Sequence, residues 1–246
     1  MKLHFYGADR CVTGSCHCLE INGKKILVDC GLQQGRDELD NRYLAFAPGN
    51  IDILLVTHAH IDHTGRIPLL VKNGFHGRIL TTRLTADLMK IMLLDSAHIQ
   101  ESDAEYENRK GERAGREHVD PLYTEQDALD VFKYVTTCEY EEKVDLCEGV
   151  SALFTDAGHL LGSASITIEL EENGVHKTIV FSGDIGNVDQ PIIRDPQLLK
   201  KADYVVMEST YGDRNHTEVW SYTGQLAQII DETLGKGGNV VIPAFA

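Results

Sequence analysis

The sequence predicts an α/β fold in which buried strands end in loops that carry ionisable side chains. The chain has 246 residues, enough for one large domain or two small ones. Its 42% hydrophobic and 25% charged content is ordinary for a folded globular protein. Short apolar runs alternate with segments of helical periodicity, which is typical of α/β proteins. Several of these runs lead directly into histidine or aspartate, so we expect strand ends to build a site.

Tight turns and short strands are expected over the first third of the chain. The dipeptide Asn22-Gly23 separates two strand-like runs, Cys18–Ile21 and Lys25–Asp29. It favours a two-residue hairpin turn because both residues tolerate positive φ angles. The apolar run Ile53–Thr57 is typical of a strand buried on both faces. A short helix is expected after it, over Gly65–Lys72.

Helical periodicity returns at Thr82 and extends to about Arg109. Thr124 then provides an N-cap for a second helix, which is expected to reach about Val135. Four later apolar runs are expected to be strands: Val150–Thr155, Ala164–Glu171, Lys177–Ser182 and Tyr204–Met207.

The end of the chain holds one more predicted helix and one more predicted strand. Thr223–Leu234 has helical character and stops at Gly235, since glycine is common just past a helix end. A strand is expected over Asn239–Ile242, and the sequence finishes soon afterwards at Ala246. Because a domain rarely ends inside an apolar strand-like run, we expect the sequence to be one portion of a larger protein.

Negative charge is concentrated in one part of the sequence. The formal net charge is −15, which disfavours a simple phosphate-binding surface. The segment Asp95–Glu148 contains 16 acidic and 6 basic residues, a net of −10. A nucleic acid can therefore still approach from another side of the molecule.

No segment has the character of a membrane span or a secretion signal. The longest apolar runs, such as Ile51–Val56, are far shorter than the roughly 20 residues that cross a bilayer. Met1–Gly7 has no apolar core of signal-peptide length. The six cysteines are interpreted as reduced thiols. We therefore expect a cytoplasmic protein that makes no contact with membranes.

Three histidines and one aspartate cluster in His58-Ala59-His60-Ile61-Asp62-His63, directly after a predicted strand. Residues two apart in extended backbone point to the same side, so His58 and His60 are expected to share one cation. The following turn directs Asp62 and His63 to a second position. Imidazole and carboxylate together suit Zn²⁺, with Mn²⁺ or Fe as alternatives. A histidine-rich surface loop is the competing interpretation, and the density of the cluster disfavours it.

Further ligands must come from elsewhere, because one loop cannot surround two cations. Asp29, His159 and Asp184 each follow a predicted strand and lie within two residues of a glycine. Each alone reads as an ordinary turn residue, but their shared placement at strand ends favours a role in the same site. Asp184 carries two carboxylate oxygens, so it can bridge two cations.

These motifs together resemble the metallo-β-lactamase family. Four further segments are similar to its β-CASP branch of RNA- and DNA-cleaving enzymes: Thr13-Gly14-Ser15, AGHLLGSA at 157–164, SGDIGN at 182–187 and Glu208–Arg214. The resemblance implies an αββα sandwich over residues 1–212, with an acidic helical insert at about 84–148. It also implies that residues 213–246 are the first elements of a β-CASP cap domain, which is cut short here.

The resemblance implies two zinc ions and assigns six ligands to them: His58, His60 and His159 hold one ion, Asp62 and His63 hold the other, and Asp184 bridges both.

The resemblance also implies roles for residues around the ligands. Asp29 would orient a ligand histidine without touching the metal. Glu208 would lie beside the site and orient a catalytic histidine. Asp62, Asp184 and Glu208 are therefore the residues expected to act in catalysis.

The activity implied is that of a zinc-dependent phosphodiester hydrolase, an RNA endonuclease or exonuclease in which two metal ions activate the attacking water. DNA as a substrate and a homodimeric assembly both stay open. In the family, the cap domain continues past the PAFA segment at 243–246 and two further histidines lie beyond it. This portion is therefore not expected to be a complete catalyst.

Two alternative functions stay open. One is a different hydrolase on the same fold, acting on an ester, thioester or lactone, which the Glu208–Arg214 segment disfavours. The other is a non-catalytic scaffold, which would be expected to have lost ligands that this sequence retains.

Overall fold

The computed structural model describes the chain except residues 36–39, 113–114, 200, 216–221 and 244–246. The chain divides into two compact units, Met1–Glu208 and Ser209–Ala246. The larger unit contains both β-sheets and four α-helices, whereas the smaller unit contains helix α5, Tyr222–Gly235. No helix in the described part of the chain is both long and apolar enough to cross a membrane.

The first sheet, sheet A, has six strands in the spatial order β1-β2-β3-β4-β5-β6. They are β1 Lys2–Gly7, β2 Cys16–Ile21, β3 Lys24–Val28, β4 Ile53–Leu55, β5 Arg78–Thr82 and β6 Val135–Cys138. Strands β1 to β3 pair antiparallel, and β3 to β6 pair parallel.

The second sheet, sheet B, has five strands in the order β11-β10-β9-β8-β7. They are β7 Lys143–Cys147, β8 Val150–Asp156, β9 Ala164–Glu172, β10 Val175–Phe181 and β11 Tyr204–Val206. Strands β7 to β10 pair antiparallel, and β10 pairs parallel with β11.

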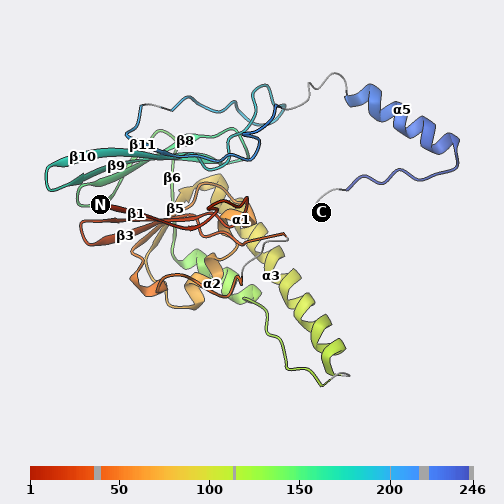
Figure 1. Ribbon diagram of the computed structural model, residues 1–246, viewed down its shortest axis with the longest axis horizontal. Helices are drawn as coiled ribbons and strands as arrows, with labels where there is room; N and C mark the ends of the chain where they lie inside the picture. The colour runs from red at the N-terminus through yellow and green to blue at the C-terminus, as the bar shows by residue number, and fades with distance from the viewer. Residues whose placement is uncertain (36–39, 113–114, 200, 216–221, 244–246) are drawn as a thin grey trace. The chain divides into compact units, whose positions relative to one another are not determined.

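The helices of the larger unit pack on sheet A, which lies between them and sheet B (Figure 1). They are α1 Ile61–Thr64, α2 Ile67–Lys72, α3 Arg83–Glu112 and α4 Glu125–Asp130, with short 3₁₀ turns at Pro48–Asn50 and Val131–Lys133. The predicted α/β class with two packed sheets is therefore confirmed.

Strand β3 shows how the sequence fills two cores at once. Successive side chains of a strand point to opposite faces. Ile26 and Val28 belong to the core between the sheets, and Leu27 belongs to the core between sheet A and the helices. All three are at most 1% exposed. The nearly continuous apolar character of β3 and β4 follows from this burial on both faces.

The predicted hairpin at Asn22-Gly23 is confirmed, and a second hairpin has the same kind of turn. Asn22 and Gly23 have φ angles of 49° and 74°, and they join β2 to β3, whose last pair is Ile21 with Lys24. Asn173 and Gly174 have φ angles of 52° and 76° and join β9 to β10. In both cases the sequence supplies residues that adopt positive φ at low cost, as a type I′ turn requires.

The secondary structure of the acidic segment Asp95–Glu148 differs from the predicted one. The helix predicted from Thr124 to about Val135 ends at Asp130, and one 3₁₀ turn follows it. The segment also contains strands β6 and β7, which join sheets A and B respectively and were not predicted. The segment thus contributes a strand to each sheet. In sheet A, its β-branched residues from Val135 onward pair with β5.

The predicted strand Asn239–Ile242 is wrong. These residues have no regular secondary structure, although their composition favours a strand. A strand needs a neighbour for its backbone hydrogen bonds, and helix α5 is the regular element of the described residues in this unit.

Strand direction brings five loops to one edge of the sandwich. Strands β3 and β4 are parallel, so the loops after Val28 and Leu55 leave sheet A together. Strands β8 and β10 are both antiparallel to β9, and β11 is parallel to β10. The loops after Asp156, Phe181 and Val206 therefore leave sheet B together as well.

Close backbone contact at Gly31 fixes the loop that holds the histidine cluster. A Cβ atom on Gly31 would lie 1.6 Å from the carbonyl oxygen of Asp62. The Gly31→Ala substitution should therefore lower the free energy of unfolding by about 2–4 kcal/mol, measured by urea denaturation. Gly49→Ala is the control, because its Cβ would meet nothing closer than 3.5 Å. Equal stability of the two variants would contradict this account of the loop.

Candidate metal centre

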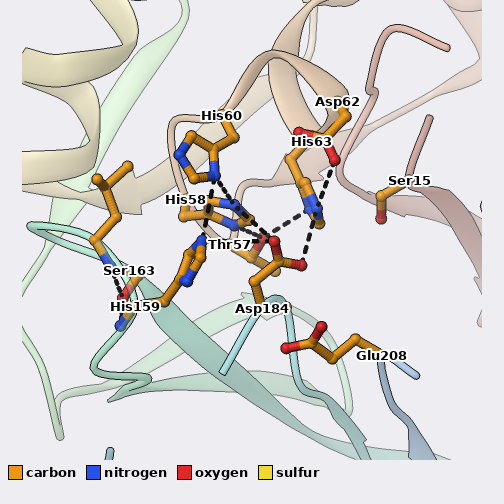
Figure 2. A network of polar contacts seen from close by, with 12 residues as sticks. Ser15, Thr57, His58, His60, Asp62, His63, His159, Ser163, Asp184 and Glu208 are labelled. Atoms are coloured by element: carbon orange, nitrogen blue, oxygen red, sulfur yellow. Dashed lines mark hydrogen bonds and ion pairs between the residues drawn. The ribbon is translucent and has the colours of Figure 1, made fainter. Parts of the chain in front are cut away.

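Four side chains from three loops converge at the shared edge of the sheets (Figure 2). His58 and His60 follow β4, His159 follows β8 and Asp184 follows β10. One ligand atom from each lies within 4.8 Å of all the others. All four residues were predicted from the sequence to belong to one site, and the fold brings them together.

The distances between these atoms suit a shared cation. His60 Nδ1 lies 3.1 Å from His58 Nε2 and 3.2 Å from His159 Nε2. Asp184 Oδ2 lies 3.6 Å and 3.5 Å from the same two nitrogens of His58 and His159. Four ligands in a tetrahedron around zinc, with bonds of about 2.0–2.1 Å, are separated by about 3.3 Å. The donor set therefore fits a divalent metal ion.

The protonation of these histidines is consistent with metal binding. Burial lowers the pKa of His58 well below its usual value, and the neighbouring histidines lower it further. Burial also lowers the pKa of His60, with a further contribution from His159. Both rings are therefore neutral at physiological pH, which is the form that coordinates a metal.

A second, smaller group of ligand atoms lies on the other side of Asp184. His63 Nε2 is 3.2 Å from Asp184 Oδ1 and 3.8 Å from Asp62 Oδ2. Asp184 thus directs one oxygen toward each group, as Figure 2 shows. Asp62 and His63 belong to the short helix α1, and the centroids of the His63 and His58 rings are 4.1 Å apart. The two groups of ligand atoms are therefore adjacent, and Asp184 lies between them.

Asp29 lies behind this second group of ligand atoms. Its Oδ2 is 2.8 Å from His63 Nδ1, so the ring donates Nδ1–H to the carboxylate and presents Nε2 to Asp62 and Asp184. Burial alone lowers the pKa of His63, but the Asp29 and Asp184 carboxylates outweigh it and raise that pKa to about 10. The carboxylates around His63 therefore stabilise positive charge on the ring.

Asp184 itself experiences opposing effects. Its burial favours the neutral acid, but the hydrogen bond and positive charge of His63 outweigh burial and lower the pKa of the carboxyl. Asp184 is therefore ionised at neutral pH.

Thr57 connects the two groups of ligands, a role that the sequence analysis missed. Its hydroxyl oxygen lies 2.9 Å from Asp29 Oδ2 and 3.1 Å from His58 Nδ1. Because His58 Nε2 faces the other ligands, Nδ1 carries the proton and donates it to Thr57, whose own hydroxyl donates to Asp29. The only sequence signal was a hydroxyl residue directly before the first histidine.

Ser163 holds the loop that carries His159. Its hydroxyl oxygen accepts the backbone N–H groups of His159 and Leu160, each at 3.1 Å. The loop that carries His159 also packs against the loop that carries Asp184, and a glycine from each forms the contact. A Cβ on Gly186 would lie 1.6 Å from the carbonyl oxygen of Gly158, so the two loops pack backbone against backbone.

Glu208 lies at the edge of the site, just after β11 (Figure 2). Its Oε1 accepts the backbone N–H of Ile185 at 2.6 Å, and its own N–H donates to Ser182 Oγ at 3.1 Å. Both contacts lie on the segment that carries Asp184. Glu208 therefore positions the Asp184 loop, and the role expected for it from the sequence, orientation of a histidine, stays a prediction.

Comparison with protein families gives one match over most of the chain. Residues 9–217 match the model of the metallo-beta-lactamase superfamily. Among solved structures, the native FEZ-1 metallo-beta-lactamase from Legionella gormanii aligns with a TM-score of 0.46 and 19% identity, over 77% of this chain and 63% of that one.

Curated relatives include proteins named for action on RNA. Ribonuclease TTHA0252 from Thermus thermophilus is 36% identical over all of this chain and 52% of its own length. Transcription termination factor FttA from Methanosarcina mazei is 32% identical over 94% of this chain and 35% of its own length. Endoribonuclease YSH1 from Yarrowia lipolytica is 31% identical over 98% and 27%. The chain thus spans about half or less of these relatives.

The position of Thr57 predicts its effect on metal binding. Thr57→Val removes the hydroxyl, keeps the shape and leaves His58 Nδ1–H without its acceptor. Affinity for the first divalent ion should fall about tenfold, measured by competition with a chromophoric chelator. Thr57→Ser should restore most of the affinity.

Thr81→Val is the matched control, because the Thr81 hydroxyl bonds the carbonyl oxygen of Val56 and no ligand. If Thr57→Val and Thr81→Val bound the ion equally well, Thr57 would have no positioning role.

Proposed function

The chain belongs to the metallo-beta-lactamase superfamily, and on this premise we propose that it is the metal-binding portion of a ribonuclease that hydrolyses phosphodiester bonds. The observation that carries the proposal is the Asp184 carboxylate, which directs one oxygen toward each of two groups of ligand atoms. The names of the curated relatives favour RNA over an ester, thioester or lactone.

A histidine and aspartate site for a divalent metal is present, and we propose that it holds two zinc ions. His58, His60 and His159 would bind one, Asp62 and His63 the other, and Asp184 both. Such ions, when bound, polarise a phosphoryl oxygen and lower the pKa of water toward 7.

The protein's own residues supply position and charge. Asp29 and Thr57 hold His63 and His58 in fixed rotamers, so little reorganisation is needed when the substrate arrives. Glu208 fixes the backbone beside Asp184 through the Ile185 amide. The scissile phosphate would lie against the open side of the two ligand groups.

Several finer expectations stay predictions. They are DNA as an alternative substrate, the choice between internal and terminal cleavage, a homodimeric assembly and a cytoplasmic location.

Substitution of Asp184 tests the proposal at its centre. Asp184→Asn keeps the size of the side chain but removes its charge and one strong ligand oxygen. It should lower RNA cleavage at least a hundredfold, measured with a labelled single-stranded RNA on the protein that contains this chain in full. Asp145→Asn, an exposed carboxylate on β7, should leave cleavage unchanged.

A lactone and a thioester are assayed beside the RNA with the same preparations. Turnover of either small substrate with no cleavage of RNA would favour another hydrolase of this fold. Full activity of the Asp184→Asn protein would refute the two-metal scheme.

Metal content gives an independent test. The purified chain, freed of metal with a chelator and then dialysed against zinc, should contain about two zinc ions by elemental analysis. Zinc at a hundred times its dissociation constant should raise the free energy of unfolding by about 2.7 kcal/mol per site. A content of one ion would remove the second position from the proposal, and no bound metal would favour a scaffold.

A further inference from the structure

A cavity lies beside the loop that carries His159, and it is separate from the metal ligands. Its volume is about 380 Å³, within the range of small-molecule sites. Four parts of the larger unit line it: the start of α3, residues 138–140 at the end of β6, the loop at 160–162 and the loop at 192–194. No metal ligand named above is among its lining residues.

The wall of this cavity is continuous with the metal centre. Leu160 and Leu161 directly follow His159, and Ser163 fixes that turn through the amides of His159 and Leu160. The carbonyl oxygen of Gly162 accepts the hydroxyl groups of Thr82 and Thr85 at 2.7 Å and 2.8 Å. The loop that carries a metal ligand on one side thus forms the cavity wall on the other.

Two arginines line the cavity, which is unusual in so acidic a chain. Arg83 lies at the first turn of α3 and Arg194 lies on the opposite loop. Both are exposed. Neither guanidinium has an ion-pair partner among the residues that the structure describes. Their planar, doubly donating groups are suited to a phosphate.

Apolar and aromatic groups complete the lining. The Tyr140 ring is held in place because its hydroxyl donates to the carbonyl oxygen of Ser163 at 2.8 Å. Leu161 and Ile192 are 45% and 84% exposed, so each presents a hydrocarbon surface. A nucleobase packs on such surfaces without regard to its identity.

We propose that this cavity is a subsite for one nucleotide of single-stranded RNA, next to the phosphodiester that is cleaved. The two arginines bind its phosphate, and Tyr140 and the aliphatic side chains contact its base. The inference rests on the proposed function, because it takes RNA as the substrate, and it adds where the chain beside the cleaved bond is held.

Two carboxylates also line the cavity, and they differ in their effect. Asp156 is 7% exposed, and its Oδ1 accepts the backbone N–H of Gly158 at 3.0 Å, so it is engaged in the loop. Glu139 is exposed and opposes an incoming phosphate. Removal of its charge should therefore strengthen binding, opposite in sign to removal of an arginine.

Fluorescence anisotropy with a labelled single-stranded RNA of about ten nucleotides tests the subsite on the zinc-loaded chain. Arg83→Ala and Arg194→Ala should each weaken binding about ten- to a hundredfold, the usual range for a charge-assisted hydrogen bond. The double variant should also lower the slope of log affinity against log salt by about 0.7, as expected for one lost phosphate contact. Glu139→Gln should tighten binding about twofold.

Arg109→Ala is the matched control. Arg109 is an exposed arginine on the same helix, about 39 Å from Arg83 along the helix axis, and its loss changes the net charge equally. If the cavity variants bound RNA as tightly as Arg109→Ala, the subsite would be refuted. Thermal unfolding of each variant shows that the fold is retained.

Different results would refute the proposed function and the proposed subsite. An unmodified chain that did not bind RNA would refute RNA as the substrate and the subsite with it. A chain that bound RNA, lost cleavage on Asp184→Asn and was indifferent to Arg83 and Arg194 would refute the subsite alone.

Discussion

The buried carboxylate of Asp29 holds together the segments from which the site is built. It is 1% exposed, and burial of a charge is costly unless hydrogen bonds compensate for it. Its oxygens accept the Ser15 hydroxyl, the Thr57 amide and hydroxyl, and His63 Nδ1–H. These donors come from the loop before β2, the end of β4 and helix α1. A displacement of any one of them would leave charge unpaired, so all are held in one arrangement.

The position of this residue accounts for its unusual backbone. Asp29 has a φ angle of 60°, a conformation that aspartate tolerates better than most residues. It comes at the end of β3, where the chain turns to bring Gly31 against Asp62. The cost of the turn is offset by the hydrogen bonds that it makes possible. At this position the residue type, the backbone angle and the hydrogen-bond partners therefore all favour the same conformation.

Residue type and local pattern were enough to predict much of the fold and most of the site. The hairpin at Asn22-Gly23 could be predicted from the turn preference of its two residues alone. The strand before His58 could be predicted from its apolar run alone. The candidate side chains could be named because imidazole and carboxylate groups that gather at the ends of buried strands suit a cation, and the family resemblance then assigned six of them as ligands. Their roles as ligands stay predictions, although the fold places them together.

What could not be predicted depends on contacts between distant segments. Strand β6 is short, and it forms because the residues from Val135 onward pair with β5, which lies far earlier in the sequence. The hydroxyl of Thr57 acquires its role only when Asp29 lies beside it. The cavity with Arg83 and Arg194 is assembled from four separate stretches, and neither arginine lies in a motif. The strand expected at Asn239–Ile242 failed for the same reason, since composition alone supplies no pairing partner.

The bare backbone contact between Gly158 and Gly186 constrains how such a site can change over evolution. His159 and Asp184 sit on loops that touch with no side chain between them, so neither loop can shift without the other. The distance between the His159 and Asp184 ligand atoms is therefore inherited from the sandwich and cannot be adjusted gradually. A lineage that came to prefer a different metal ion would have to exchange ligand atoms, one residue at a time, within a frame of constant dimensions.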